Sequence, residues 1–486
     1  MVRILPRFAT GWLAAILGSG CFTLQLAAQA SGKEIALYPV SIHWDNPEPL
    51  VTTDRLFSIN GFKAFFPEYA NNPAYNEGLS YLNPGLLRMH NAGMHNADMW
   101  VDDTAKTWNR KKIQAVLDGL KLPGEKIMIN ISRWPSWMDK DGDRRLDEGQ
   151  EDAFANFCAE LVEIVNVEQG RGVRYFEITN ECDFVYWREQ LSSGNENELL
   201  GTEAQNKRHQ PMPDKLADIY IRTADAMKAV DPTIKTGGPA AASGSSNVLP
   251  MHRVFIEQAL PGLDFFSFHG YPRTRTHTPE EIYDTPSIFA DNIRRHVQLL
   301  KELSPDRHIE LHLNEFNIAS NWRLQDKRMH TEEGAVFDAL FMVECARAGA
   351  DVLSAWNECD STYGKMDMQC NLRIPAHIFH FFNAWLVGQT YAVSPSGVTD
   401  GPEGKSIVAF AVKSKNGEHN FVLINRAREP VQVQLNMTGW RPATDSHVKT
   451  ARVDAEGLHT SILTASALAE PVFLPTNSVN FFSCGQ

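Results

Sequence analysis

The stretches Phe176-Glu177-Ile178-Thr179-Asn180-Glu181 and Leu311-His312-Leu313-Asn314-Glu315-Phe316-Asn317 decide the fold that this sequence predicts. Each is an apolar run of strand length that reaches an Asn-Glu pair near its end. The interval between the two pairs fits three strand–helix units of about 45 residues each, in a large barrel of parallel strands. Because such strands end at one rim of the barrel, Glu181 and Glu315 are predicted to face each other there.

Strand-like runs alternate with amphipathic stretches from about residue 56 to residue 388, which is typical of parallel α/β architecture. The helical stretches include Asp152–Val167, Asp214–Ala229, Ile288–Leu303 and Thr331–Ala348. Eight units favour a closed (β/α)8 TIM barrel over an open doubly wound sheet, and no Gly-rich phosphate turn follows the first run. The eight runs are 57–66, 86–90, 126–131, 175–181, 233–239, 265–271, 308–316 and 351–358.

A second domain is predicted after about residue 389, where short alternating strands are separated by Gly, Pro and Asn turns. The pattern favours an antiparallel β-sandwich over residues 389–486, after a catalytic barrel at 51–388. Residues 31–50 contain another strand-like run, which we expect to join the β domain. The C-terminal strands are expected at 406–413, 419–425, 431–435, 447–453 and 478–484.

The first 30 residues have the pattern of an export signal. Arg3 and Arg7 flank the start of an apolar stretch that ends in a small-x-small cleavage site, Ala28-Gln29-Ala30. A membrane anchor is the alternative, but Gly18-Ser19-Gly20 interrupts the apolar stretch. We expect removal after Ala30, a secreted, periplasmic or extracellular location, and no integral membrane segment in the mature chain.

The composition and charge of the chain limit the classes of partner and substrate that it is expected to bind. The chain has 486 residues, of which 43% are hydrophobic, so it can bury a sizeable core. Its formal charge of −13 argues against a nucleic-acid partner and weakly disfavours a strongly sulfated or polyuronate substrate, although a local cluster of Lys and Arg could override that global effect. Cys359 and Cys370 lie in one predicted loop and are the expected disulfide pair.

The strand ends carry the side chains of a sugar-binding site. Indole and phenol rings cover the apolar faces of sugar rings, while amides, imidazoles, guanidinium groups and carboxylates satisfy the hydroxyls. For two tryptophans that follow the third run, barrel packing is the alternative. Glu177 lies near ~13 Å back along its strand from Glu181, so it is predicted to be an internal partner. The predicted substrate-binding residues are Arg88, His90, Trp134, Trp137, Asn180, His269, Tyr271, Asn317, Trp356 and Glu358.

The run from Phe176 to Asp183 resembles the acid/base signature of retaining (β/α)8 glycosidases in the clan of β-xylosidases and α-L-iduronidases, glycoside hydrolase family 39. Agarase- and porphyranase-type enzymes of family 86 belong to the same broad group. The chain departs from the signature at Thr179, where a Trp is usual, and at Cys182, where a Pro is usual.

The resemblance implies that Glu181 is the general acid/base and Glu315 the nucleophile of a double displacement. By it, Asn180 would bind the 2-hydroxyl of the sugar and Arg88 would orient the nucleophile. His269 or Tyr271 would contact the nucleophile or substrate, and Trp356 would floor the subsite.

The predicted protein is therefore an enzyme, a retaining O-glycosyl hydrolase of poly- or oligosaccharides that needs no cofactor or metal. Carboxyl groups about 5–5.5 Å apart would support retention, whereas about 6.5–9.5 Å would point to inversion.

Two other functions stay open at this point. A metal-dependent barrel hydrolase is one, because His308, Glu310 and His312 fall on one face of the seventh run. A carbohydrate-binding protein without catalysis is the other. The acidic loop 139–147 resembles a calcium loop, but Arg144 occupies the position where an EF-hand needs glycine, so a solvated loop is favoured.

Overall fold

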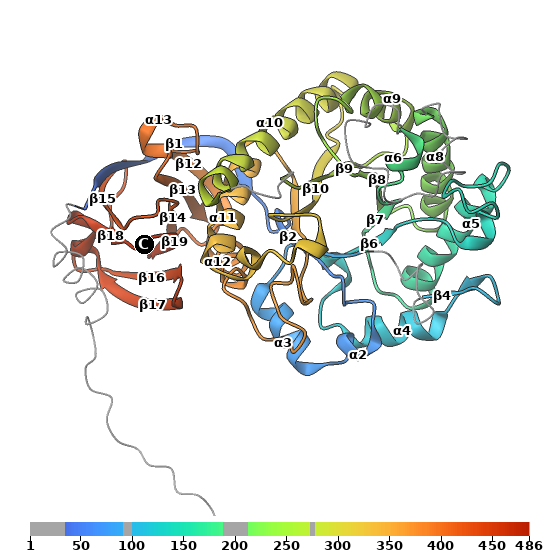
Figure 1. Cartoon of the computed structure of the whole chain (residues 1–486), viewed down its shortest axis with the longest axis horizontal. Coiled ribbons are helices and arrows are strands. Elements are labelled where there is room, and N and C mark those ends of the chain that lie inside the picture. Colours follow the sequence, from blue (N-terminus) through green and yellow to red (C-terminus); the bar gives the residue numbers. More distant parts are fainter. Residues whose placement is uncertain (1–34, 91–99, 188–211, 273–277, 486) are drawn as a thin grey trace, which may run out of the picture.

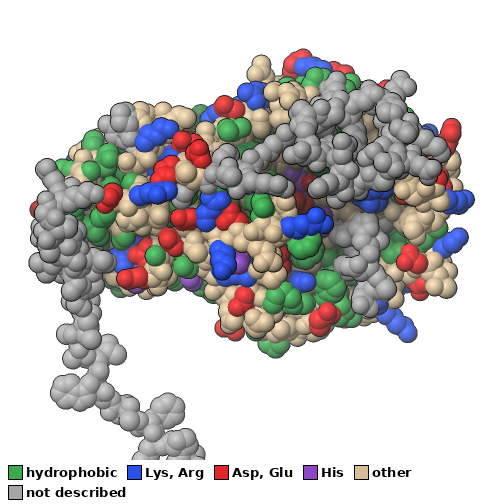
Figure 2. Space-filling model, viewed as in Figure 1, with side chains coloured by type: hydrophobic (Ala, Val, Ile, Leu, Met, Phe, Trp, Pro, Cys, Tyr) green, Lys and Arg blue, Asp and Glu red, His purple; other side chains and the backbone are tan. Residues whose placement is uncertain are grey.

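The computed structural model describes residues 35–90, 100–187, 212–272 and 278–485, and Figure 1 shows a barrel beside a β domain. The predicted export signal lies outside these residues. Among the helices of the described ranges, none has the length and apolarity needed to cross a membrane. On the face drawn in Figure 2, side chains of both charge signs are intermingled over the described surface.

Eight parallel strands close into a barrel with the neighbour order β10-β11-β2-β3-β6-β7-β8-β9, which confirms the predicted (β/α)8 fold class. Each predicted run overlaps one strand. The strands are short and almost fully buried on both faces, as expected for parallel strands covered by helices. They are β2 (Phe57–Asn60), β3 (Leu87–Met89), β6 (Ile127–Ile131), β7 (Tyr175–Ile178), β8 (Lys235–Ala241), β9 (Phe265–Gly270), β10 (Glu310–Phe316) and β11 (Val352–Ala355).

Helices cover the outside of the barrel (Figure 1). The longest, α10, begins at a capping box in which Thr278 and Glu281 satisfy each other's backbone N–H groups. A two-stranded ribbon, β4 (Val101–Asp102) with β5 (Thr107–Trp108), lies between the second and third barrel strands in sequence. The helices are α2 (Pro67–Ala70), α3 (Pro73–Leu82), α4 (Arg110–Gly119), α5 (Glu151–Val162), α6 (Asp183–Tyr186), α8 (Pro213–Val230), α9 (Leu249–Ala259), α10 (Pro279–Leu303), α11 (Glu332–Arg347) and α12 (Ala376–Trp385).

The β domain is one nine-stranded sheet with the order β17-β16-β19-β14-β13-β12-β1-β15-β18. Its neighbours are antiparallel except β1 and β15, which run parallel, so the sheet is mixed. The short helix α13 (Gly401–Gly404) precedes β13. The strands are β1 (Leu37–Thr52), β12 (Gly388–Ser394), β13 (Ile407–Ser414), β14 (His419–Asn425), β15 (Val431–Thr438), β16 (His447–Asp454), β17 (Gly457–Thr464), β18 (Val472–Leu474) and β19 (Ser478–Cys484).

The central strands of this sheet are buried on both faces because each face has its own core. In β13, Val408 and Phe410 belong to the large core of the barrel, whereas Ile407 and Ala409 belong to the core of the β domain. Helix α11 lies between the two domains, and its residues from Gly334 to Ala346 are all buried. The two domains therefore share one continuous apolar interface.

The prediction of a disulfide between Cys359 and Cys370 is wrong, because the structure contains no bond between them. All six cysteines of the described ranges are free and buried. The Cys359 thiol instead donates a hydrogen bond to the carbonyl oxygen of Asp367, at 3.1 Å, inside the loop that follows β11.

This loop is anchored to α11 by an ion pair between Lys365 and Asp338, both of which are 1% exposed. The Lys365 ammonium also lies 5.4 Å from the centre of the Phe379 ring on α12. Because removal of one partner leaves the other charge buried and uncompensated, we predict that Asp338→Ala lowers the free energy of unfolding by about 3–5 kcal/mol.

Urea denaturation followed by circular dichroism checks this prediction. The double variant Asp338→Leu with Lys365→Met serves as the control, since it removes both charges and should recover most of the loss. A urea midpoint of Asp338→Ala equal to that of the parent would contradict the role of the pair.

Candidate active site

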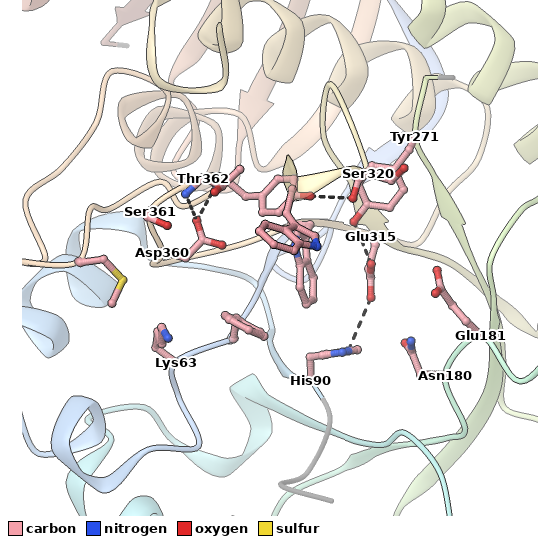
Figure 3. A pocket seen from close by; sticks show the side chains of 15 residues that line it. Lys63, His90, Asn180, Glu181, Tyr271, Glu315, Ser320, Asp360, Ser361 and Thr362 are labelled. Atoms are coloured by element: carbon pink, nitrogen blue, oxygen red, sulfur yellow. Dashed lines mark hydrogen bonds and ion pairs between the residues drawn. The ribbon is translucent and has the colours of Figure 1, made fainter. Parts of the chain in front are cut away.

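Glu181 and Glu315 lie at the carboxyl ends of β7 and β10, on the same rim of the barrel. One carboxylate oxygen of each lies within 4.8 Å of the other and of a ring nitrogen of His269. Glu181 follows β7 in a left-handed conformation (φ 52°), and its N–H donates to the carbonyl of Ala240 at 2.9 Å. Figure 3 shows the two carboxylates side by side at one end of a cavity. The upper limit of 4.8 Å between the nearest oxygens is compatible with the carboxyl separation of about 5–5.5 Å found in retaining glycosidases.

The Glu315 carboxylate is held by donors on both oxygens. Arg88 Nη1 donates to Oε1 at 3.1 Å, and the Tyr271 hydroxyl donates to Oε2 at 2.8 Å. His90 Nδ1 lies 3.6 Å from Oε1. The side chain of Glu315 is 8% exposed, whereas that of Glu181 is 34% exposed. Glu315 is therefore a fixed, charge-compensated carboxylate, and Glu181 is the more accessible of the two.

His269, at the end of β9, bridges the two carboxylates. Its Nδ1 lies 2.8 Å from Glu181 Oε1, and its Nε2 lies 3.5 Å from Glu315 Oε1. Burial lowers the pKa of His269, but the charges of Glu315 and Glu181 outweigh burial and raise it above its ordinary value. The imidazole thus fixes the distance between the two acidic groups.

Burial raises the pKa of the Glu315 carboxyl, and the nearby Glu181 adds to that effect. The charges of His269 and Arg88 and the hydroxyl of Tyr271 act in the opposite direction. Burial and the Glu315 charge also raise the pKa of the Tyr271 phenol well above its ordinary range, so Tyr271 stays a hydrogen-bond donor.

A buried network inside the barrel supports Glu315 from below. Arg88, which is fully buried, donates through Nε to Glu177 at 2.6 Å and through Nη2 to the Asn180 side-chain oxygen at 2.6 Å. Asn60 accepts from Arg88 Nη1 at 2.7 Å. Burial opposes ionisation of Glu177, but Arg88 and the amides around it lower the pKa of that carboxyl. The side-chain oxygen of Asn180 is taken by Arg88, which leaves the amide NH2 group to donate to a ligand.

The cavity at this rim has a volume of about 520 Å³, within the range of ligand sites. Figure 3 shows Glu181 and Asn180 at one end of it, with Lys63, Asp360 and Ser361 at the other. Both aromatic rings and polar groups line it, as sugar binding requires. Its lining residues are Phe62, Lys63, His90, Asn180, Glu181, Tyr271, Glu315, Ser320, Trp322, Trp356, Asp360, Ser361, Thr362, Tyr363 and Met368.

Four predicted substrate-binding residues line this cavity: His90, Asn180, Tyr271 and Trp356. The His90 and Trp356 rings meet edge to face, with their centres 4.8 Å apart. Two other predicted residues, Arg88 and His269, are buried behind the carboxylates, where they position Glu315 and Glu181 and do not line the cavity.

Trp134 and Trp137 were predicted to bind substrate, but in the structure both pack against other aromatic rings. Trp134 is 2% exposed, and its ring packs edge to face against Phe154 and Tyr186. Trp137 packs in the same way against Phe157. Neither lines the cavity, because the loop after β6 turns both rings toward α5.

Asn317 and Glu358 were predicted to bind substrate, but in the structure both bind the backbone of neighbouring segments and position it. Asn317 donates to the carbonyl of Trp356 and is 1% exposed. Glu358 is fully buried, and its carboxylate accepts from the backbone N–H groups of Phe62 and Lys63, at 2.7 and 2.6 Å. Burial raises the pKa of Glu358 to about 7, against these N–H groups. It therefore holds in place the segment that supplies Phe62 and Lys63 to the cavity.

Several lining residues were not predicted from the sequence. Phe62 and Lys63 fell inside the run 57–66, read as strand throughout, but β2 ends at Asn60 and leaves both residues beyond the rim. Trp322, which is 61% exposed, follows β10 on a short turn of 3-10 helix. A tryptophan in a polar segment after a strand end was the available signal.

The metal-binding alternative is not supported at the rim. Glu310 and His312 pair with each other at 2.9 Å, and β10 begins at Glu310, so this pair lies at the opposite end of the barrel from Glu315. Glu181, His269 and Glu315 are close enough to share an ion. However, the guanidinium of Arg88 already lies 3.1 Å from Glu315, and a divalent cation there would face that charge.

The acidic loop caps its own backbone. Asp139 accepts from the N–H of Arg144 at 3.1 Å, Asp141 from that of Asp143 at 3.1 Å, and Asp147 from that of Lys140 at 3.2 Å. These hydrogen bonds stabilise the turn from within the loop.

Comparison with known proteins relates the chain to glycosyl hydrolases. The family model for glycosyl hydrolases family 39 matches residues 209–373, a range that contains Glu315 but not Glu181. A curated β-xylosidase of Geobacillus stearothermophilus is 26% identical over 172 residues, which are 33% of this chain and 31% of that relative. The chain thus matches about a third of the relative's length.

Solved structures share the fold over nearly the whole chain. A GH39 enzyme of Xanthomonas axonopodis pv. citri has a TM-score of 0.64 at 14% identity, covering 94% of this chain and 99% of its own. A monomeric β-xylosidase of Caulobacter crescentus has a TM-score of 0.62 at 14% identity, covering 92% and 99%. The resemblance to family 86 stays a prediction. The match to the family 39 model and the curated relative support a family 39-like glycoside hydrolase, and the solved structures show that the fold is shared.

Proposed function

We propose that the protein is a retaining hydrolase of O-glycosidic bonds in poly- or oligosaccharides, exported after removal of its first 30 residues. The observation that carries the proposal is the pair of rim carboxylates whose oxygens lie within 4.8 Å, bridged by His269. Such a pair can act on the two faces of one anomeric centre.

In the first step, Glu315 attacks the anomeric carbon while Glu181 gives its proton to the departing oxygen. The donors from Arg88 and Tyr271 favour the ionised form of Glu315, which suits the nucleophile. The greater exposure of Glu181 suits the group that must exchange protons with a leaving group and then with water.

In the second step, Glu181 takes a proton from water, which attacks the glycosyl–Glu315 ester and releases the sugar with its original configuration. The Asn180 amide is oriented by Arg88 and donates to the sugar hydroxyl beside the anomeric carbon. Trp356 offers an aromatic face to the same ring.

We predict that Glu315→Ala and Glu181→Ala each remove nearly all turnover of 4-nitrophenyl glycosides, because each lacks one half of the acid/nucleophile pair. The exposed Glu302→Gln, on the outer helix α10, is the matched control and should keep parental kcat/KM.

Added azide separates the two roles. In Glu181→Ala, azide should replace water in the second step and give a glycosyl azide with the configuration of the substrate. In Glu315→Ala, azide should displace the leaving group directly and give the opposite configuration. NMR of the products distinguishes the two. Near-parental turnover in either variant would refute the role assigned to that carboxylate, whereas absence of turnover by the parent would leave a binding protein as the better description.

A pH profile tests the role of Tyr271. The nucleophile must be ionised, so kcat/KM falls as the pH drops through the pKa of Glu315. Tyr271→Phe removes a donor that lowers this pKa, so the acid limb should move to higher pH and kcat should fall about tenfold or more. An unmoved acid limb would show that Tyr271 serves only in packing.

A further inference from the structure

A second, smaller cavity meets the main one at Glu181. Its volume is about 180 Å³, and its lining is His90, Ser132, Arg133, Arg144, Asn180, Glu181 and Phe184. Three of these residues, His90, Asn180 and Glu181, also line the larger cavity. Glu315 lines the larger cavity but not the smaller one. The two spaces therefore join at the acid/base carboxylate.

The junction defines which part of a substrate each cavity receives. The sugar attacked by Glu315 must lie over that carboxylate, in the larger cavity. The departing oxygen must lie within reach of Glu181, and whatever it carries must continue past Glu181 into the smaller cavity. The smaller cavity is thus the site for the leaving group.

The leaving-group cavity has a cationic lining. Arg133 follows β6 directly after Ser132, and its side chain forms no ion pair or hydrogen bond within the described ranges. Its Nε is shielded from solvent and unpaired. A guanidinium group that is half-buried and without a carboxylate partner is costly unless a ligand compensates it.

Arg144 supplies the second guanidinium. It has a left-handed backbone (φ 69°), a conformation that glycine adopts more readily, yet the residue is a long cation that reaches the cavity. Both arginines act electrostatically on the buried Cys182 beside Glu181: burial raises the pKa of that thiol, and the two charges lower it. The two cations therefore approach the same end of the site.

Two nearby carboxylates, those of Asp183 and Asp139, accept hydrogen bonds from backbone N–H groups. Asp183 is 1% exposed and turns both oxygens to the N–H of Ala242, at 3.1 and 3.2 Å. Asp139 accepts from the backbone of Arg144. Arg145, the next residue, turns its guanidinium away, to the carbonyl of Val185 at 2.6 and 2.9 Å.

We propose that Arg133 and Arg144 bind an anionic group, a carboxylate or a sulfate ester, on the leaving-group side of the substrate. This inference rests on the proposed function and narrows its substrate class to glycosides whose aglycone sugar is acidic. The chain has a net charge of −13, so recognition of an anion depends on this local pair.

Matched leaving groups test the inference. A panel of 4-nitrophenyl glycosides first identifies the sugar that the parent enzyme releases fastest. Glycosides of that sugar are then made with nitrophenols that carry a carboxylate, a sulfonate or a primary amide at the same ring position. The measured quantity is the ratio of kcat/KM for each anionic leaving group to that for the amide, which cancels differences in active enzyme concentration.

We expect the parent enzyme to prefer an anionic leaving group by roughly tenfold to hundredfold, and the preference to weaken in high salt. A larger ratio for the carboxylate than for the sulfonate points to a uronate, and the reverse points to a sulfate ester. Arg133→Gln and Arg144→Gln should each reduce the ratio toward one, and Arg133→Lys should retain part of it. Arg294→Gln removes one charge from the outer helix α10, where it is 54% exposed, and should leave the ratio unchanged.

A parent ratio near one, or an unaltered ratio in both glutamine variants, would overturn the inference while the hydrolase function stands. Absence of turnover on every glycoside of the panel, by contrast, would overturn the proposed function itself.

Discussion

The rim depends on a single buried cation. Arg88 is fully buried, and its donors reach Glu177, Asn60, Asn180 and Glu315. A guanidinium group inside a barrel is tolerated only when its donors and charge are matched, and here one carboxylate matches it from within the barrel and one from the rim. Arg88 therefore links the packing of the barrel interior to the position of Glu315. The same cation orients Asn180, so the Glu315 carboxylate and the Asn180 amide cannot shift independently.

The architecture could be read from the sequence because it follows from local patterns. Buried parallel strands are short continuous apolar runs, and each predicted run overlaps one strand of the barrel. Glu181 and Glu315 could be singled out for the same reason, since the carboxyl ends of all strands in a parallel barrel lie at the same rim. Glu177 was separated from them by its position within the strand.

The details of the site could not be read in this way. Glu358 also follows an Asn at a strand end, yet it points toward Phe62 and Lys63, and only their placement shows that it binds backbone N–H groups. Trp134 has the sequence context of a sugar platform, but α5 offers Phe154 as a packing partner. Arg133 and Arg144 stand 11 positions apart in a polar loop, and their approach to one cavity depends on how that loop folds. The direction of a side chain at the end of a strand depends on contacts with segments that are distant in sequence.

The position of α11 bears on how this protein can be divided. Most helices on such barrels expose one face to water, but α11 is covered by the barrel on one side and by β14, β16 and β19 on the other. Excising residues 389–486 would uncover a contiguous apolar strip along a helix of the catalytic barrel. The β domain is thus an integral part of the folded chain and not a module that can be exchanged. Truncated forms without it are expected to aggregate.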